Sequence, residues 1–323
     1  TMTTSIIIAV KAWQKNLKEC VSKCLELDYS DFEILILPDA PLEKKCPWSF
    51  SGRVGIFPTG PVCPADKRDL ALNYARGEIL AFIDDDAYPA KDWLKCAMED
   101  FEDNSVAAVG GPSVTPFNDS LPKKASGAIY SSYLVSGNFI YRYIPGKKRE
   151  VDDLPSCNLL VRKSVMQGLG GFNTSFWPGE DTKLCLEITK KLKKKIIYDP
   201  KVLVYHHCRP VFIPHLKQIA NYALHRGYFV KKYPATSLKV SYFIPSLFLL
   251  GLLFGSTLSL FYIPLRVLYS SVLSFYLCLA FIFSISKELR LIPLVFSGII
   301  LSHISYGLFF LKGLLSKKLK EEL

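Results

Sequence analysis

A short apolar segment that runs directly into three carboxylates constrains this chain more than any other feature. Residues 80–83 are apolar, and Asp84, Asp85 and Asp86 follow at once. An apolar run of this length is typical of a buried strand, and open α/β sheets place their ligands at the C-terminal ends of their strands. The three negative charges repel one another unless a cation or hydrogen-bond donors compensate them.

Two interpretations of the aspartates remain open on this segment alone. Magnesium and manganese prefer oxygen ligands, and magnesium is usually held by one or two carboxylates together with substrate phosphates. This favours a divalent-cation site for a phosphorylated substrate. The alternative is an acidic turn that caps a helix beginning near Asp92, since aspartate also favours turns and helix N-caps.

The remaining pattern predicts an α/β unit around this segment. Residues 5–10 form an apolar, β-branched strand, apolar residues recur at helical spacing over residues 17–27, and residues 32–37 form a second strand that ends near Asp39. A unit of this length implies a parallel pair of strands with a right-handed crossover.

A further helix is expected over residues 64–78, with Lys67 and Arg68 in its first turn. Cations in a first turn oppose the helix dipole, so an anionic neighbour would explain them. The alternative is two solvated surface charges.

Hydrophobic residues make up 50% of the 323 residues, and their excess collects after about Ser241. The uncharged runs 241–265, 267–286 and 291–311 each match the roughly 20 residues that cross a bilayer. Arg266 and residues 287–290 separate the runs, because a charge is costly at the centre of a spanning helix.

We therefore expect four consecutive parts. These are a catalytic α/β domain (1–210), interfacial amphipathic helices (211–240), about three transmembrane helices (241–312) and a basic tail (313–323). Three spans from a cytoplasmic start would leave the tail outside, against the positive-inside tendency, so the number of spans stays open.

The cysteines and the first ten residues indicate on which side of the membrane the catalytic domain lies. The nine cysteines show no regular spacing, and residues 1–10 lack a basic segment followed by a long apolar core. Both features predict a catalytic domain on the cytoplasmic side.

The formal net charge of +11 suits partners that are anionic, with basic clusters at residues 147–149 and 190–195. No zinc-finger spacing or basic-aromatic RNA motif accompanies this charge, which argues against nucleic acid. Beside apolar spans, anionic lipid and phosphate are the expected partners.

The order of these pieces resembles the family 2 glycosyltransferases of the GT-A fold, a Rossmann-like, mostly parallel sheet flanked by helices. The matching stretches are residues 5–11, 32–39, 75–86, 170–172 and 179–181. Pro38 departs from the family, which often carries a first aspartate there. The absence of a QxxRW motif in residues 218–229 makes a processive polymer synthase a less favoured expectation.

The resemblance implies a nucleotide-sugar donor whose diphosphate is bridged by Mg²⁺ or Mn²⁺ at Asp84 and Asp86. His206 falls where relatives often carry a histidine that reaches the metal or the diphosphate. Asp84 or Asp85 would accept from the ribose hydroxyls.

It also implies roles around the nucleoside and the acceptor. Asp39 would meet the nucleoside, Val10 would approach it through its backbone, and Lys67 would lie near the base or phosphates. The pair Glu180–Asp181 resembles the acidic motif of the family, with Asp181 as general base.

Two further residues are candidates from the sequence alone. Trp177 would stack on a sugar or pack over the Gly170–Gly171 turn. Arg226 would hold a phosphate or snorkel to the lipid surface.

The resulting expectation is an inverting, metal-dependent, membrane-bound glycosyltransferase of the hexosyltransferase type. It would move a sugar from a nucleotide donor to a lipid-linked acceptor at the cytoplasmic leaflet, in the synthesis of a cell-envelope polysaccharide. One alternative is a nucleotidyl- or phosphoryl-transferring enzyme on a similar sheet. The other is a degenerate transferase domain that acts as a membrane scaffold.

Overall fold

The computed structural model describes residues 2–41, 48 and 51–322, and this part of the chain forms two compact units. The first comprises Thr1–Val114 and Ile144–His206, and the second comprises Thr115–Tyr143 and His207–Leu323. Residues 115–143, which the linear division into four parts did not set apart, group with the C-terminal helices. The sequence also predicts a loop at residues 43–60, part of which lies outside the described residues.

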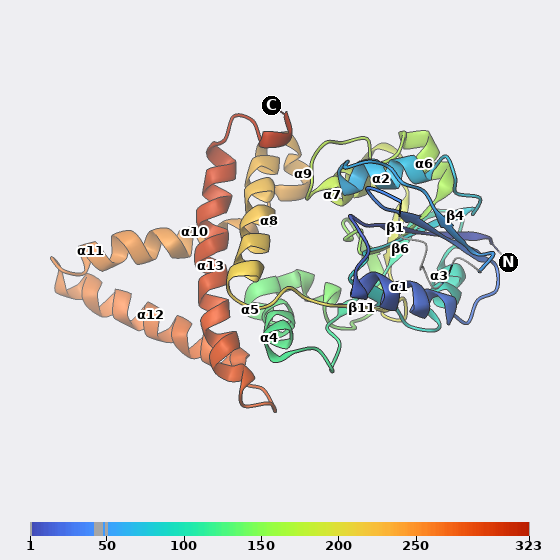
Figure 1. Ribbon diagram of the computed structural model, residues 1–323. Coiled ribbons are helices and arrows are strands. Elements are labelled where there is room, and N and C mark those ends of the chain that lie inside the picture. The colour runs from blue at the N-terminus through green and yellow to red at the C-terminus, as the bar shows by residue number, and fades with distance from the viewer. Residues whose placement is uncertain (1, 42–47, 49–50, 323) are drawn as a thin grey trace. The chain divides into compact units, whose positions relative to one another are not determined.

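A mixed sheet forms the centre of the first unit (Figure 1). Its strands, in spatial order within the described residues, are β3 (Val54–Ile56), β2 (Phe32–Leu37), β1 (Thr4–Ala9), β4 (Ile79–Ile83), β9 (Asn158–Arg162), β6 (Val106–Gly110), β10 (Lys195–Tyr198) and β8 (Arg149–Val151). Strands β3, β2, β1 and β4 run parallel, as do β6 and β10, whereas β9 and β8 pair antiparallel with their neighbours. The predicted mostly parallel α/β sheet is confirmed.

Helices cover both faces of this sheet, which explains why its central strands are largely apolar. Helices α1 (Lys15–Leu25) and α3 (Trp93–Asp100) cover one face, where Ile6, Ile34 and Ala81 are fully buried. Helices α2 (Pro64–Ala71), α6 (Lys163–Leu169) and α7 (Glu180–Leu186) lie on the other face. The parallel strands β1, β2 and β4 therefore end side by side, and the residues that follow them meet at one edge.

A smaller sheet within the first unit brings a distant segment to this edge. It consists of β5 (Ala87–Pro89), β11 (Val204–His206) and β7 (Ser113–Val114), with β11 in the middle. Strand β11 pairs antiparallel with β5 so that His206 lies opposite Ala87. The histidine therefore lies next to the end of the aspartate triplet.

Several elements differ from their predicted bounds. The helix expected over residues 64–78 ends at Ala71, and the chain then makes tight turns before β4. The sequence predicts a helix over residues 182–190, whereas α7 begins two residues earlier, at Glu180, and continues as a π-helical turn, η2 (Glu187–Lys191). The segment 126–143, irregular in sequence, contains parts of α4 (Leu121–Tyr130), α5 (Tyr133–Ser136) and the 3₁₀ helix η1 (Gly137–Arg142).

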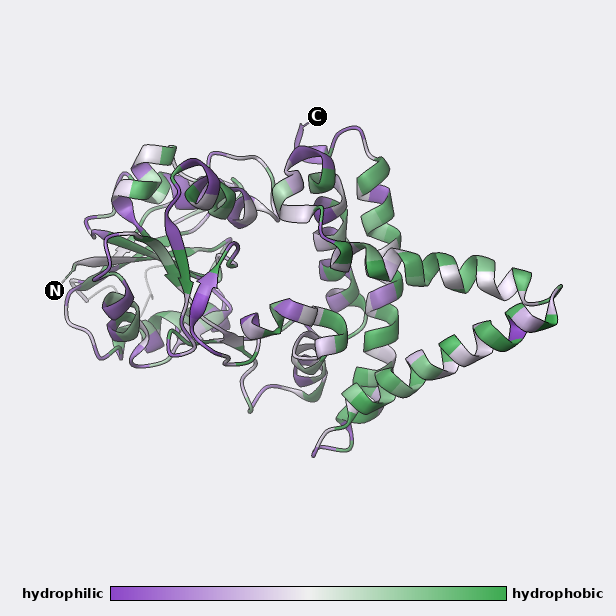
Figure 2. Ribbon diagram, turned by 180° about the vertical axis from the view of Figure 1, so that it is seen from behind, coloured by the Kyte–Doolittle hydropathy of each residue, from purple (hydrophilic) through white to green (hydrophobic). Residues whose placement is uncertain are grey.

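The second unit is otherwise helical. Its C-terminal elements are α8 (Ile213–Lys232), α9 (Pro234–Ser237), α10 (Val240–Leu250), η3 (Gly251–Gly255), α11 (Ser256–Leu258), α12 (Ile263–Ser284), α13 (Leu291–Leu315) and η4 (Lys320–Glu322). Among the described residues, three helical segments are long and apolar enough to span a bilayer: Val240–Leu258, Ile263–Ser284 and Leu291–Glu322. Figure 2 shows apolar residues along most of these helices.

Glycine allows α8 and α13 to pack closely. A Cβ atom on Gly227 would lie 2.1 Å from the carbonyl oxygen of Phe310, and one on Gly313 would lie 2.0 Å from that of Leu224. Any larger side chain at either position would force the helices apart. Within this unit, the third apolar segment is thus joined to the amphipathic helix that precedes the spans.

Asn158 provides a test of how the first unit is held together. Its Oδ1 accepts a hydrogen bond from Trp93 Nε1 at 2.9 Å, and its Nδ2 donates to the carbonyl oxygens of Pro112 and Val202 at 3.2 and 2.8 Å. We expect Asn158→Ala to leave these buried groups unsatisfied, which costs about 2–4 kcal/mol and lowers Tm by roughly 5–10 °C. Thermal unfolding in detergent checks this against Asn104→Ala at an exposed position; equal Tm values for the two variants would contradict the assignment.

Candidate active site

Lys67 joins the ends of β1 and β2 into a polar corner. Its Nζ donates to the carbonyl oxygens of Val10 and Leu37 at 3.0 and 3.2 Å and lies 2.6 Å from Asp39 Oδ1. The Lys67 side chain is only 4% exposed, so it is not a solvated surface charge. Three residues predicted to surround the nucleoside, Val10, Asp39 and Lys67, therefore meet at one point.

The first and third aspartates of the triplet form a candidate metal site with His206. One ligand atom from each of Asp84, Asp86 and His206 lies within 4.8 Å of the other two. His206 Nε2 lies 3.2 Å from Asp86 Oδ1, as expected from the pairing of β11 with β5. Two carboxylates and an imidazole suit Mg²⁺ or Mn²⁺, with positions left for substrate phosphates. The residues thus fit the cation that the sequence predicts.

Burial and repulsion between neighbouring carboxylates raise the pKa values of Asp84 and Asp85. Burial raises the pKa of Asp85 to about 7, and the charges of Asp86 and Asp84 act in the same direction. Burial also raises the pKa of Asp84, although the guanidinium of Arg68 opposes this. A bound cation would relieve this cost, because it favours the ionised form of each carboxylate.

Arg68 is the residue of this site whose role the sequence did not indicate. Its side chain is 4% exposed and ion-pairs with two carboxylates, from Nη2 to Asp84 Oδ1 at 2.8 Å and from Nη1 to Glu180 Oε1 at 2.7 Å. The interpretation as a surface charge is wrong, because α2, in whose last turn Arg68 lies, directs the guanidinium into the sheet edge. The anionic neighbours expected for this cation are the carboxylates of Asp84 and Glu180.

The Gly170–Gly171–Phe172 turn packs against Arg68 and is held in place by Asp69. Asp69 Oδ1 and Oδ2 accept the backbone N–H groups of Phe172 and Asn173 at 2.7 and 3.0 Å. Gly171 has a φ of +87°, and a Cβ atom there would lie 2.3 Å from Asp69 Oδ1. The turn places the Phe172 ring 5.8 Å from the guanidinium carbon of Arg68. This glycine motif is therefore structural.

Glu180 and Asp181 occupy the first turn of α7, and hydrogen bonds from backbone N–H groups hold both side chains. Asp181 Oδ2 accepts from Ser156 at 3.2 Å, and Oδ1 accepts from Thr182 at 2.7 Å. Burial raises the pKa of Asp181 to about 7, and the charges of Glu180 and Asp153 add to the shift. A carboxylate with a pKa near neutral pH is well matched to general-base catalysis.

The other predicted residues are placed as follows. Trp177 is 43% exposed and lies just before α7. Arg226 belongs to the second unit, where its guanidinium lies 5.1 Å from the ring centroid of Tyr242. The charge and position of the basic loop at residues 147–149 predict that it faces the phosphates of an acceptor. In the structure, Lys148 of this loop ion-pairs with Asp100 and with Asp199, the latter at 2.9 Å. The roles of Trp177 and Arg226 stay predictions.

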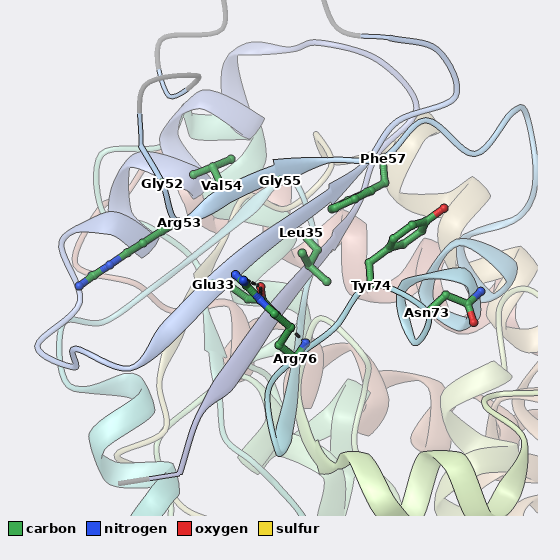
Figure 3. A pocket seen from close by; sticks show the side chains of 10 residues that line it. All are labelled: Glu33, Leu35, Gly52, Arg53, Val54, Gly55, Phe57, Asn73, Tyr74 and Arg76. Carbon is green, nitrogen blue, oxygen red and sulfur yellow. Dashed lines mark hydrogen bonds and ion pairs between the residues drawn. The ribbon is translucent and has the colours of Figure 1, made fainter.

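A separate pocket opens on the first unit beside β2 and β3 (Figure 3). Phe57 and Tyr74 stack on one side, with ring centroids 4.1 Å apart, and Arg76 binds Glu33 on another. None of the residues predicted from the sequence lines this pocket. The predicted site is at the carboxylate edge instead.

The fold and this edge define a class of protein: a GT-A-type α/β fold with a polar Lys67–Asp39 corner and a candidate divalent-metal site at the edge of its sheet. The structure of a mannosyltransferase from Pyrobaculum calidifontis, solved with GDP-Man and Mn²⁺, has a TM-score of 0.66 at 17% identity, covering 98% of this chain and 88% of that one. The glycosyl transferase family 2 model matches residues 5–170. The chain belongs to this family, and the predicted fold with C-terminal apolar helices is confirmed.

Two curated relatives extend the comparison. A pre-mycofactocin glycosyltransferase of Mycobacterium tuberculosis is 30% identical over 146 residues, which are 45% of this chain and 30% of that protein. A glucosyl-dolichyl phosphate glucuronosyltransferase of Haloferax volcanii is 21% identical over 224 residues, which are 64% of this chain and 69% of that protein. The chain thus spans about a third of the first relative and about two thirds of the second.

The metal site makes a direct binding prediction. Asp86→Ala removes one of three converging ligands, so we expect the affinity for Mn²⁺ alone to fall on the order of tenfold or more. The measurement is the free Mn²⁺ signal in electron paramagnetic resonance during titration of the protein. Asp103→Ala, which removes an exposed carboxylate of the same unit, should leave the affinity unchanged; equal losses in both variants would refute this site.

Proposed function

We propose that this protein is a metal-dependent, inverting glycosyltransferase that moves a sugar from a nucleotide donor to a lipid-linked acceptor. The observation that carries the proposal is the meeting of two groups of residues at one sheet edge. The Lys67–Asp39 corner suits a nucleoside, and the Asp84–Asp86–His206 cluster suits a cation beside its diphosphate. Membership in glycosyl transferase family 2 and the GDP-Man bound in the Pyrobaculum mannosyltransferase structure support this assignment.

The donor half of the site would bind and orient the nucleotide. Asp39 and the backbone of Val10 would bind the nucleoside, and the ion pair with Lys67 would hold Asp39 in place. Asp84 or Asp85 would accept hydrogen bonds from the ribose hydroxyls. Asp84, Asp86 and His206 would hold Mg²⁺ or Mn²⁺. When bound, this cation supplies charge stabilisation for the departing diphosphate, worth several kcal/mol.

The acceptor half would use Asp181 as the base. Its carboxylate takes the proton of an acceptor hydroxyl as the acceptor oxygen bonds to the anomeric carbon of the sugar. The bond from that carbon to the diphosphate oxygen breaks, and the nucleoside diphosphate leaves with the electron pair. A single displacement of this kind inverts the anomeric centre. The exposed ring of Trp177, close to Asp181 in sequence, would stack against a sugar.

The second unit supports a membrane acceptor with an anionic head. Around Arg226 and Tyr242, the ring of Phe139 stacks on Tyr242 at 5.7 Å, and Arg142 and Lys239 lie 4.7 and 5.6 Å from the Phe139 centroid. Lys239 immediately precedes the first apolar segment, so this basic-aromatic group would lie near the membrane surface. By its name, the Haloferax relative acts on a dolichyl phosphate derivative.

A donor screen with the purified, detergent-solubilised protein tests the proposal. We expect one nucleotide sugar to yield free nucleoside diphosphate only when Mn²⁺ or Mg²⁺ and a polyprenyl phosphate or lipid-linked saccharide are present. Release of pyrophosphate would instead indicate nucleotidyl transfer. Equal transfer to soluble sugars would contradict the lipid-linked acceptor, and donor binding without any turnover would favour a scaffold. Inside-out vesicles, which expose the cytoplasmic face, should accept added donor if the catalytic unit is cytoplasmic.

Asp181 gives the reaction a predicted pH dependence. Because the base must be ionised and burial raises its pKa to about 7, kcat with a hydroxyl acceptor should fall as the pH drops through that region, with a midpoint at or below 7 once a cation is bound. Asp181→Asn should lower kcat by about 10²–10⁴-fold and spare donor binding. A phosphate acceptor, already ionised, would lose far less. An unchanged pH profile in Asp181→Asn, with Asp103→Asn as the matched control, would remove Asp181 from this role.

A further inference from the structure

One buried guanidinium joins the two halves of the site. Arg68 binds the candidate metal ligand Asp84 through Nη2 and Glu180, the neighbour of the proposed base, through Nη1. Asp84 directly follows strand β4, and Glu180 is the first residue of helix α7, 96 residues later in the sequence. Because the fork of a guanidinium is planar and rigid, it fixes the distance and the angle between its two partners.

We propose that Glu180 sets the cation affinity of Asp84 through Arg68, without itself being a metal ligand. Arg68 is thus a positioning residue that couples the metal side of the site to the α7 turn. The inference rests on the proposed metal-dependent function of this site, and it assigns a role to a residue that the family resemblance did not single out.

The charges explain why the second carboxylate matters. An isolated Arg68–Asp84 pair would be neutral, and the guanidinium would compete with a divalent cation for the Asp84 carboxylate. Glu180 shares the positive charge of Arg68 at 2.7 Å, so the three groups together keep one net negative charge. Asp84 can then offer charge to a cation while one of its oxygens stays hydrogen-bonded to Arg68.

The surroundings prevent Arg68 and Glu180 from moving apart. Glu180 Oε2 accepts the Gly179 backbone N–H at 3.0 Å, and Oε1 lies 3.4 Å from Ser156 Oγ. Arg68 lies over the Phe172 ring, which Asp69 fixes through the backbone of that turn. Removing the charge of Glu180 therefore changes the electrostatic potential at the Asp84 carboxylate, because the side chains are held too firmly to rearrange.

A double-mutant cycle on Mn²⁺ binding tests this coupling. Mn²⁺ alone is titrated into the full-length protein, wild type, Glu180→Gln, Arg68→Met and the double variant, and free Mn²⁺ is read by electron paramagnetic resonance. We expect Glu180→Gln to weaken Mn²⁺ binding about three- to tenfold when Arg68 is present and less than about twofold when it is Met, since residues in one ion-pair network are coupled. The same fold-change in both backgrounds, or no change at all, would overturn the proposal.

Two further variants keep the test decisive. Arg68→Lys retains the charge but loses the fork, so the effect of Glu180→Gln should shrink in that background also, even if Arg68→Met fails to fold. Arg76→Met breaks another Arg–Glu pair of the same unit, with Glu33, and should leave Mn²⁺ affinity unchanged. A merely structural Arg68 would lower Tm in EDTA and leave the Glu180→Gln effect on Mn²⁺ intact.

The outcome is separable from that of the proposed function. Mn²⁺ binding requires neither donor nor acceptor, so absence of sugar transfer would refute the function and leave the coupling standing. Conversely, an active enzyme whose Mn²⁺ affinity is unchanged by Glu180→Gln would refute only the coupling. Failure of the wild-type protein to bind Mn²⁺ would refute both.

Discussion

Negative charge gathered at one edge of the sheet costs free energy, and the cations that compensate it organise the first unit. The imidazole of His206 lies 3.2 Å from Asp86 Oδ1 at this edge. Lys67 binds Asp39 and Arg68 binds Asp84 and Glu180, and these two cations come from a single turn of α2. The position of that helix over the strand ends is therefore a condition for the whole site, and the Asp69–Phe172 contacts hold it there.

The C-terminal helices are constrained by their apolar surface rather than by charge. Residues that face hydrocarbon gain nothing from burial in protein, so three apolar segments can be largely exposed and still be stable in a bilayer. Within this unit, α8 packs on α13 through glycine contacts, and residues 115–143 belong with them. A chain segment inserted between two strands of the first unit thereby belongs to the helical unit.

The sequence predicted the parts of this structure that depend on local pattern. The strand before Asp84, the pair of strands ending near Val10 and Asp39, and the apolar spans all follow from composition and periodicity. The meeting of Asp84 with Asp86 and His206 followed only from family resemblance, because pairing of β11 with β5 is a long-range event. The partners of Arg68 could not be predicted, since the environment of a cation on a short helix is ambiguous until the element packed opposite it is known. The same holds for Gly171, where a Cβ atom would lie 2.3 Å from Oδ1 of Asp69, 102 positions earlier.

The central claim is that the carboxylate edge binds a nucleoside diphosphate together with a divalent cation. Calorimetric titration of UDP and of GDP into the purified protein, with Mn²⁺ and with EDTA, tests it most directly. We predict that one of the two nucleotides binds at least tenfold more tightly with Mn²⁺, and that Asp86→Ala abolishes the difference. Nucleotide affinity that is indifferent to Mn²⁺ in the wild-type protein would contradict the account.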